Sequence, residues 1–226
     1  MDVGHALAVA VIHPLGGADM LKPKAARKRK AKKAWRDPHD WYVEPVWCAD
    51  LIAAHLAVMM RATENDMAWD PACGLGTFVE ALQFLMPACG TDIVDRGADR
   101  SLWRGELDFL GPHGFRPDNK GLLHIVSNPP FKRAEAFARR ALELATGYVA
   151  MLVPVGWLCS IGRHAFFEQL PPIAIAYLSN RPSMPPGAKI AELGKAAFKG
   201  GTTDYCVVIW DTRQPTPMTR AVWLKR

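Results

Sequence analysis

The sequence predicts an α/β protein built on a doubly wound sheet of seven strands, mostly parallel, in which the last strand runs antiparallel. Three observations lead to this prediction. Short apolar segments typical of buried strands alternate along the chain with segments whose apolar residues recur at helical spacing. A glycine-rich turn at 74–76 joins the first such strand directly to a helix. A long loop at 179–202 precedes the last strand and leaves room for the chain to reverse direction.

The elements follow from local pattern. The first helix is predicted at 46–60, where apolar residues such as Ile52 and Leu56 repeat every three or four positions, and Pro45 keeps the segment 41–45 before it extended. The later helices are predicted at 78–85, 133–146 and 162–170. The strands are predicted at 67–69, 88–93, 105–110, 122–127, 148–153, 173–178 and 205–210.

The composition limits the classes of protein to which this sequence can belong. With 226 residues, half of them hydrophobic, the chain is expected to be one globular domain with at most a small appendage. No apolar run reaches the ~20 residues that span a bilayer, and the first residues lack the positive start of a signal peptide. The five cysteines are odd in number and form no CxxC pair, and the histidines lack metal-ligand spacing. We therefore expect a cytoplasmic protein without a metal site, a disulfide framework or a membrane segment.

Basic charge is concentrated near the start of the chain. The segment 22–33 holds eight of the 28 basic residues and no acidic one, so the rest of the chain carries 20 basic against 22 acidic residues. Like charges cannot pack together, and we expect a disordered basic leader at 1–34 and a single folded domain at 35–226. The leader is either a solubilising tail or an arm whose Lys28, Arg29 and Lys30 contact nucleic-acid phosphates.

The turn after the first predicted strand has the form of a nucleotide-binding site. Gly74 and Gly76 allow positive φ angles and let a ligand approach the backbone. Val79 occupies the place of the third glycine in a dinucleotide fingerprint, and the turn lacks the lysine of a phosphate-binding loop. With Asp70 before it, the turn suits a nucleoside that carries hydroxyls and a cationic end. A plain strand-to-helix turn is the alternative.

Two acidic residues follow later strands. Asp92 lies near the end of the second strand, where nucleotide-binding α/β proteins place an acceptor for ribose hydroxyls. Its alternative is a turn aspartate. Asp108 can accept a hydrogen bond from an adenine amino group while Phe109 covers the ring. The alternative there is a surface aspartate beside a core phenylalanine.

The run Asn128-Pro129-Pro130-Phe131 follows a buried strand and is the second anchor of the sequence. Its prolines hold an extended, rigid turn, so the asparagine amide and nearby carbonyls point in set directions. Two carbonyls that accept the N–H bonds of an exocyclic base amine would localise its lone pair, and methyl transfer to that amine would then need alignment and electrostatics rather than a strong base. Phe131 offers a face on which a base can stack. As a single motif, Asn-Pro-Pro is equally typical of a plain turn.

The Asp-Pro-x-Cys-Gly-x-Gly and Asn-Pro-Pro-Phe motifs together resemble S-adenosylmethionine-dependent N6-adenine DNA methyltransferases of the small phage or bacterial type. This resemblance, over roughly residues 37–210, implies a Rossmann-like class I methyltransferase fold and a location in the cytoplasm of a bacterial or phage-infected cell. The segment 40–45 is similar to the motif that precedes the cofactor loop in the γ order, although Glu44 replaces the small hydroxyl residue common there. By resemblance, the catalytic residues are Asn128, Pro129, Pro130 and Phe131. The cofactor-binding residues are Tyr42, Glu44, Pro45, Asp70, Ala72, Cys73, Gly74, Gly76, Thr77, Asp92, Ile93, Asp108 and Phe109.

The resemblance also bears on the substrate. Because no large recognition domain follows Phe131, we expect DNA with a short or relaxed target sequence, contacted by 154–167 and by the loop 179–202 with its Arg181 and Lys189. The target adenine would be flipped into the Phe131 pocket. Three alternatives stay open: an RNA base, a protein glutamine, or a degenerate methyltransferase-like fold that acts as a binding subunit.

Overall fold

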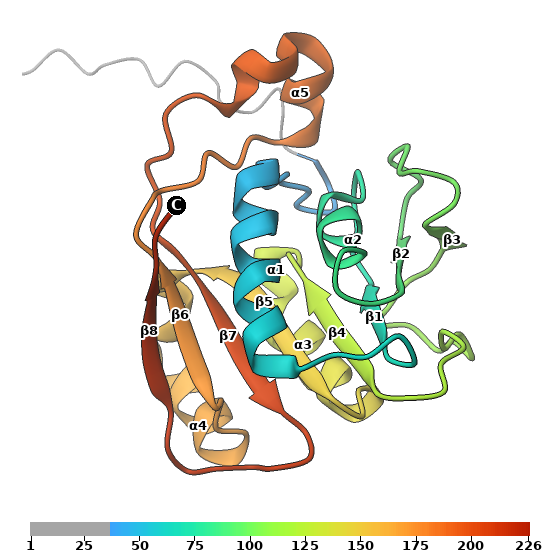
Figure 1. The fold of residues 1–226 in the computed structure, drawn as a ribbon. Helices are drawn as coiled ribbons and strands as arrows, with labels where there is room; N and C mark the ends of the chain where they lie inside the picture. Colours follow the sequence, from blue (N-terminus) through green and yellow to red (C-terminus); the bar gives the residue numbers. More distant parts are fainter. Residues whose placement is uncertain (1–36) are drawn as a thin grey trace, which may run out of the picture. The chain divides into compact units, whose positions relative to one another are not determined.

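Residues 37–226 are described by the computed structural model, and they form one eight-stranded sheet with helices on both faces (Figure 1). The predictions for the leader 1–34 lie outside the described residues. The order of the strands across the sheet is β3-β2-β1-β4-β5-β7-β6-β8. The strands are β1 (Met67–Asp70), β2 (Ala88–Asp92), β3 (Trp103–Glu106), β4 (Leu123–Ser127), β5 (Tyr148–Pro154), β6 (Ala174–Leu178), β7 (Tyr205–Asp211) and β8 (Arg220–Leu224).

The prediction of seven strands is wrong by one. Strands β1 to β5 are parallel to one another, β7 runs antiparallel to both β5 and β6, and β8 adds an edge strand parallel to β6. The predicted last strand, now β7, is therefore antiparallel as expected, but it is not the last strand of the sheet. Because β7 is the only one of the eight to reverse, the sheet is mostly parallel.

Residues 37–226 contain five helices and three short 3-10 segments. Both sheet faces need a cover because the central strands are apolar on both sides, and helices that precede β1 or follow β1, β4, β5 and β6 supply it. The helical elements are α1 (Val46–Met60), α2 (Thr77–Leu82), η1 (Phe131–Arg133), α3 (Ala134–Leu144), η2 (Val155–Leu158), α4 (Ile161–Gln169), α5 (Gly187–Leu193) and η3 (Gly194–Phe198).

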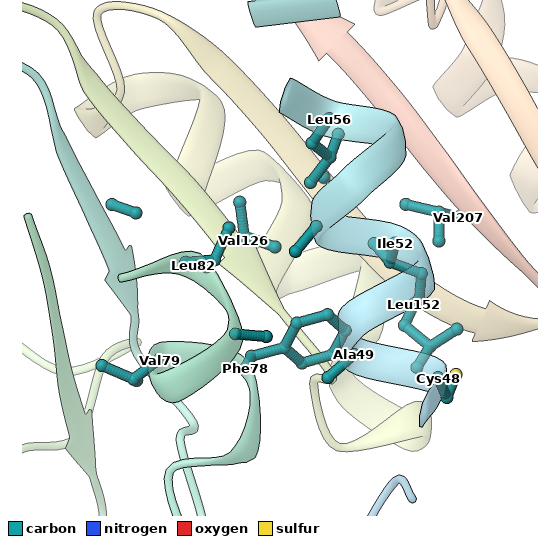
Figure 2. Close-up of a cluster of buried hydrophobic side chains, with 14 of the residues drawn as sticks. Cys48, Ala49, Ile52, Leu56, Phe78, Val79, Leu82, Val126, Leu152 and Val207 are labelled. Carbon is teal, nitrogen blue, oxygen red and sulfur yellow. The ribbon is translucent and has the colours of Figure 1, made fainter. Parts of the chain in front are cut away.

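One core lies between the sheet and helices α1 and α2. Figure 2 shows Ile52 and Leu56 of α1 beside Phe78 of α2, with Val126 and Leu152 of the sheet beneath them. These side chains are all 1% exposed or less. Helix α1 is thus held on the sheet mainly by the hydrophobic effect. Its contribution to the free energy of folding is ~25 cal/mol per Å² of apolar surface removed from water.

The second core lies on the opposite sheet face. Alternation along the strands divides the side chains between the two cores: Ile125 and Met151 face the second core, whereas their neighbours Val126 and Leu152 face the first. Phe137 of α3 is one of the helix side chains that fill it. This two-sided burial fixes the register of the strands, and with it the position of every residue at their ends.

Several element bounds differ from the prediction. The helix predicted at 78–85 is the shorter α2, and the strand predicted at 105–110 lies earlier as β3, since Glu106 pairs with Asp92 and the chain then leaves the sheet. The segment 179–202, predicted as a loop, contains α5 and η3. Within residues 37–226, no helix combines the length and hydrophobicity that crossing a membrane requires.

Candidate active site

A cavity opens at the carboxyl ends of the central parallel strands. Strand β1 pairs with β2 on one side and β4 on the other, so the residues that follow these three strands meet at one edge of the sheet. The turn 71–75 and the run 128–131 both line the cavity. The empty space between its walls and at its open mouth amounts to about 970 Å³. The two sequence motifs therefore share one pocket.

The glycine turn is fixed by backbone hydrogen bonds and by a carboxylate. Gly74 and Gly76 have φ angles of 53° and 89°, which residues with a Cβ rarely adopt. The Gly74 N–H donates to Oδ2 of Asp92 at 2.9 Å, and the Cys73 N–H donates to the carbonyl of Thr91 at 3.0 Å. The end of β2 thus holds the turn in shape.

Trp41 packs over this turn. A Cβ on Gly74 would lie only 2.8 Å from the indole Nε1, and a Cβ on Gly187, at the start of α5, would overlap the same ring. The Arg96 guanidinium lies 4.3 Å from the ring centroid and pairs with Asp37 at 2.7 Å. A close-fitting indole therefore joins the segment before α1 to the glycine turn and to α5.

Asp70 links the ends of β1 and β4 beneath the cavity. The Ser127 hydroxyl donates to its Oδ1 at 2.7 Å, and the Ala72 N–H donates to the same oxygen at 3.0 Å. Asp70 is 2% exposed. It does not line the cavity wall, so the structure places it as a support of the turn.

Three buried carboxyl groups lie in the cavity wall or beneath it. Glu44, Asp70 and Asp92 form no salt bridge with any residue of the range 37–226. Burial raises the pKa of all three, to about 8 for Asp70, whose pKa is also raised by the charges of Glu44 and Asp92. Hydrogen bonds from backbone N–H groups oppose the rise at each. The region therefore favours a ligand that brings positive charge.

The raised pKa of Asp70 predicts a pH-dependent stability. Since the folded-state pKa of about 8 exceeds the ordinary aspartate pKa of 3.8, the stabilisation present below pH ~4 is lost as pH rises towards 8, by up to ~1.4 kcal/mol per pH unit. Asp70→Asn keeps an acceptor for Ser127 and Ala72 and removes the charge. Its free energy of unfolding should therefore exceed that of the unsubstituted protein by an amount that grows between pH 5 and 8. Urea unfolding at several pH values measures this difference, and a constant difference would contradict the assignment.

Asn128 occupies the other side of the cavity. Its Nδ2 donates to the Tyr42 carbonyl at 3.0 Å and to Oε2 of Glu44 at 2.8 Å. Its Oδ1 is buried and accepts no hydrogen bond within residues 37–226. A buried acceptor without a donor is costly unless a ligand supplies one. The amide oxygen of Asn128 can therefore accept a hydrogen bond from an N–H group of a ligand.

Aromatic side chains flank this asparagine. The Phe131 ring stacks on Tyr42, with centroids 5.8 Å apart and planes 16° apart, and contacts Tyr205 at 5.8 Å. The Phe109 ring is instead held in the second core by Trp69 and Phe137, at centroid distances of 5.3 and 5.1 Å. Phe109 still borders the cavity.

Most of the residues predicted for the site line this one cavity. They are Tyr42, Glu44, Ala72, Cys73, Gly74, Asp92, Ile93, Asp108, Phe109, Asn128, Pro129, Pro130 and Phe131. Four others are near it in sequence but outside its wall: Pro45, Asp70, Gly76 and Thr77.

Two of the predicted nucleic-acid contacts, Arg181 and Lys189, lie within the described residues. Arg181 forms an exposed salt bridge with Asp204 at 2.6 Å, and Lys189 lies on α5. Lys28, Arg29 and Lys30 lie outside the described residues.

Sequence reasoning missed the cations at the cavity. Lys132 and Arg133 directly follow the Asn-Pro-Pro-Phe run, are exposed, and line the cavity with Arg96. The Arg133 side chain forms no ion pair within residues 37–226, whereas Lys132 Nζ lies 4.0 Å from Asp40. Their position directly after the Asn-Pro-Pro-Phe run could have indicated that they border the cavity.

Several solved structures with a similar backbone carry the name of a methyltransferase. A type I restriction-modification methyltransferase subunit from Streptococcus thermophilus matches with a TM-score of 0.60 at 11% identity, over 80% of this chain and 47% of that one. The chain has a methyltransferase-like α/β fold. A candidate class I S-adenosylmethionine-dependent methyltransferase from Listeria monocytogenes matches with a TM-score of 0.58 at 16% identity, over 80% and 65%. This chain thus spans from about half to two thirds of the length of these methyltransferases.

A shorter structure shares the same fold. A candidate RNA methyltransferase from Pyrococcus horikoshii matches with a TM-score of 0.54 at 14% identity, over 80% of this chain and 91% of that one. Neither a family model nor a curated protein sequence matches this chain. The match to methyltransferases therefore concerns the fold.

Proposed function

We propose that the protein transfers a methyl group from S-adenosylmethionine to the N6 amine of adenine in DNA. One observation carries the proposal: the buried, unpartnered Oδ1 of Asn128 belongs to the same cavity as the glycine turn 71–75. A methyltransferase that acts on an amine needs an N–H acceptor beside its donor site, and these two elements supply that arrangement.

The chemistry of the cavity fits this donor. S-adenosylmethionine carries a methyl group on a sulfonium, together with a cationic amine, a ribose and an adenine. Asp92 is a buried carboxyl group without an ion pair within residues 37–226, which suits a positively charged ligand, and it lies at the end of β2, where α/β proteins bind ribose hydroxyls. Gly74 keeps the backbone of the turn accessible.

The role of the protein in the reaction is alignment. Asn128 Oδ1 and a carbonyl of the Pro129-Pro130 turn accept the two N–H bonds of the target amine, which directs its lone pair at the methyl carbon. As the nitrogen takes the methyl group, the S–CH₃ bond of the sulfonium would break and leave a neutral thioether. The Asn128 oxygen would keep its N–H hydrogen bond while the nitrogen becomes tetrahedral and positive, and the surplus proton would then leave to water. Phe131 supports the base by stacking, worth ~1–3 kcal/mol.

Cations at the cavity favour nucleic acid as the substrate. Lys132 and Arg133 are exposed at the motif that would hold the base, where the phosphates of a flipped nucleotide must pass. We include the basic segment 22–33 in the proposed interface. The name of the Streptococcus thermophilus structure refers to restriction-modification, which supports DNA over the other acceptors.

A panel of acceptors tests the proposal. The protein is incubated with tritiated S-adenosylmethionine and with duplex or single-stranded DNA that contains or lacks adenine, with RNA, and with a glutamine-containing peptide. We expect label only in DNA that contains adenine, recovered as N6-methyladenine after digestion. Label in RNA or in the peptide would support amine methylation by this protein but would show that the substrate is not DNA. Absence of label from every acceptor, with the cofactor bound, would support a non-catalytic subunit.

A further inference from the structure

The carboxylate of Glu44 holds the amide of Asn128 from a segment 84 residues away in the sequence. Glu44 lies just before α1 and is 6% exposed. Its Oε2 accepts one Nδ2–H bond of Asn128 at 2.8 Å, and the carbonyl of Tyr42 accepts the other at 3.0 Å. Both hydrogens of the amide are thereby used.

This pair of acceptors decides which way the amide points. The Tyr42 carbonyl can only accept a hydrogen bond, and Oε2 of Glu44 accepts one from Nδ2 at 2.8 Å. An Asn128 amide turned by 180° would place its own oxygen against two acceptors and leave its NH₂ unpaired. The side chain is thus held with Nδ2 towards Tyr42 and Glu44, and its Oδ1 remains free for a substrate N–H.

A charged acceptor also changes the amide oxygen itself. Donation from Nδ2 to a carboxylate is charge-assisted, and it shifts electron density through the amide towards Oδ1. An oxygen with more negative charge binds the developing positive charge of a methylated amine more strongly. In a buried site, this effect is stronger than in water.

We propose that Glu44 is the positioning residue of Asn128: it orients the amide and strengthens its oxygen as the acceptor for the target amine. The inference rests on the proposed function and assigns Glu44 a role other than cofactor binding. It also explains why an acid occupies a place where a small hydroxyl would be too short to reach the amide.

Three variants test the proposal. Glu44→Ala should lower kcat about 10- to 100-fold and change the Kd for S-adenosylmethionine less than threefold. Glu44→Gln still offers an oxygen to Nδ2 but carries no negative charge, so its kcat should lie between those of Glu44→Ala and the unsubstituted protein. Asp66→Ala is the matched control, because Asp66 is also a buried carboxylate but holds Leu122 and Thr63 at the opposite edge of the sheet. It should lower the melting temperature and leave kcat unchanged.

A spectroscopic measurement covers the case in which Glu44→Ala does not fold. The Asn128 side-chain NH₂ signals, assigned by their loss in Asn128→Ala, should be shifted from those of solvent-exposed amides and should move in Glu44→Gln. If the Asn128 NH₂ signals had the chemical shifts of a solvent-exposed amide and did not change in Glu44→Gln, the inference would be overturned.

The outcomes separate this inference from the proposed function. If the unsubstituted protein methylates no acceptor, the proposed function fails whatever the Glu44 variants do. If it methylates DNA and folded Glu44→Ala keeps its kcat, only the role of Glu44 fails. Equal losses of kcat in Glu44→Ala and Asp66→Ala would likewise reduce Glu44 to a structural residue.

Discussion

Asn128→Ala is expected to abolish methyl transfer, with a fall in kcat of at least ~10³-fold, while S-adenosylmethionine still binds with nearly the same Kd. The variant removes the unpartnered Oδ1, the acceptor that would orient the target amine. It leaves the glycine turn and Asp92 in place, because their hydrogen bonds do not involve Asn128. Initial rates with tritiated S-adenosylmethionine and calorimetric titration of the cofactor measure the two quantities.

Asn119→Ala is the control for this variant. Asn119 is a partly exposed loop asparagine outside the cavity lining, and its Nδ2 donates to the Gly121 carbonyl, so its substitution should change neither quantity. If Asn128→Ala turned over at the rate of Asn119→Ala, Asn128 would have no catalytic role.

Asp92→Ala is expected to weaken the binding of S-adenosylmethionine about 100-fold. The carboxylate acts twice in the proposed site, because Oδ2 holds the Gly74 N–H at 2.9 Å and Oδ1 holds the Val94 N–H at 3.1 Å, beside the place proposed for the ribose. Its removal deprives the ribose of an acceptor and frees the turn under the cofactor. Calorimetric titration across a range of protein concentrations measures the change.

Asp95→Ala separates this effect from a general loss of negative charge. Asp95 lies three residues away, is exposed and holds Gly97 and Arg100 rather than the glycine turn. It should bind the cofactor within about twofold of the unsubstituted protein. Equal Kd values for the two variants would remove Asp92 from the cofactor site.

The helix α1 shows what the sequence could predict. Its bounds, Val46–Met60, coincide with those predicted, because Pro45 marks the start and apolar residues recur at helical spacing to the end. Strand β8 shows the opposite case. Its pairing with β6 depends on an edge that forms only when β6 and β7 are in place, and its exposed Trp223 and the charged Arg220 at its start are not typical of a buried strand.

The same distinction between local and long-range features applies to the site. The turn at 74–76 and the Asn-Pro-Pro-Phe run could be found because each is a continuous segment whose geometry is local. The bond between Glu44 and Asn128 could not, since it joins segments 84 residues apart whose meeting depends on the whole sheet. The sequence left open whether Phe109 covers a ligand or belongs to the core; its ring packs against Trp69 and also borders the cavity, so a ligand role for it stays a prediction.

The packing of Trp41 restricts how this chain can vary. Gly74 and Gly187 each lie so close to the indole that neither position accepts a side chain while the tryptophan remains. A substitution at one of the three sites is therefore tolerated only with compensating changes at the others. Among related proteins, these positions should covary as a unit, and a library that redesigns the α5 segment should keep Trp41 and Gly74 constant or randomise all three together.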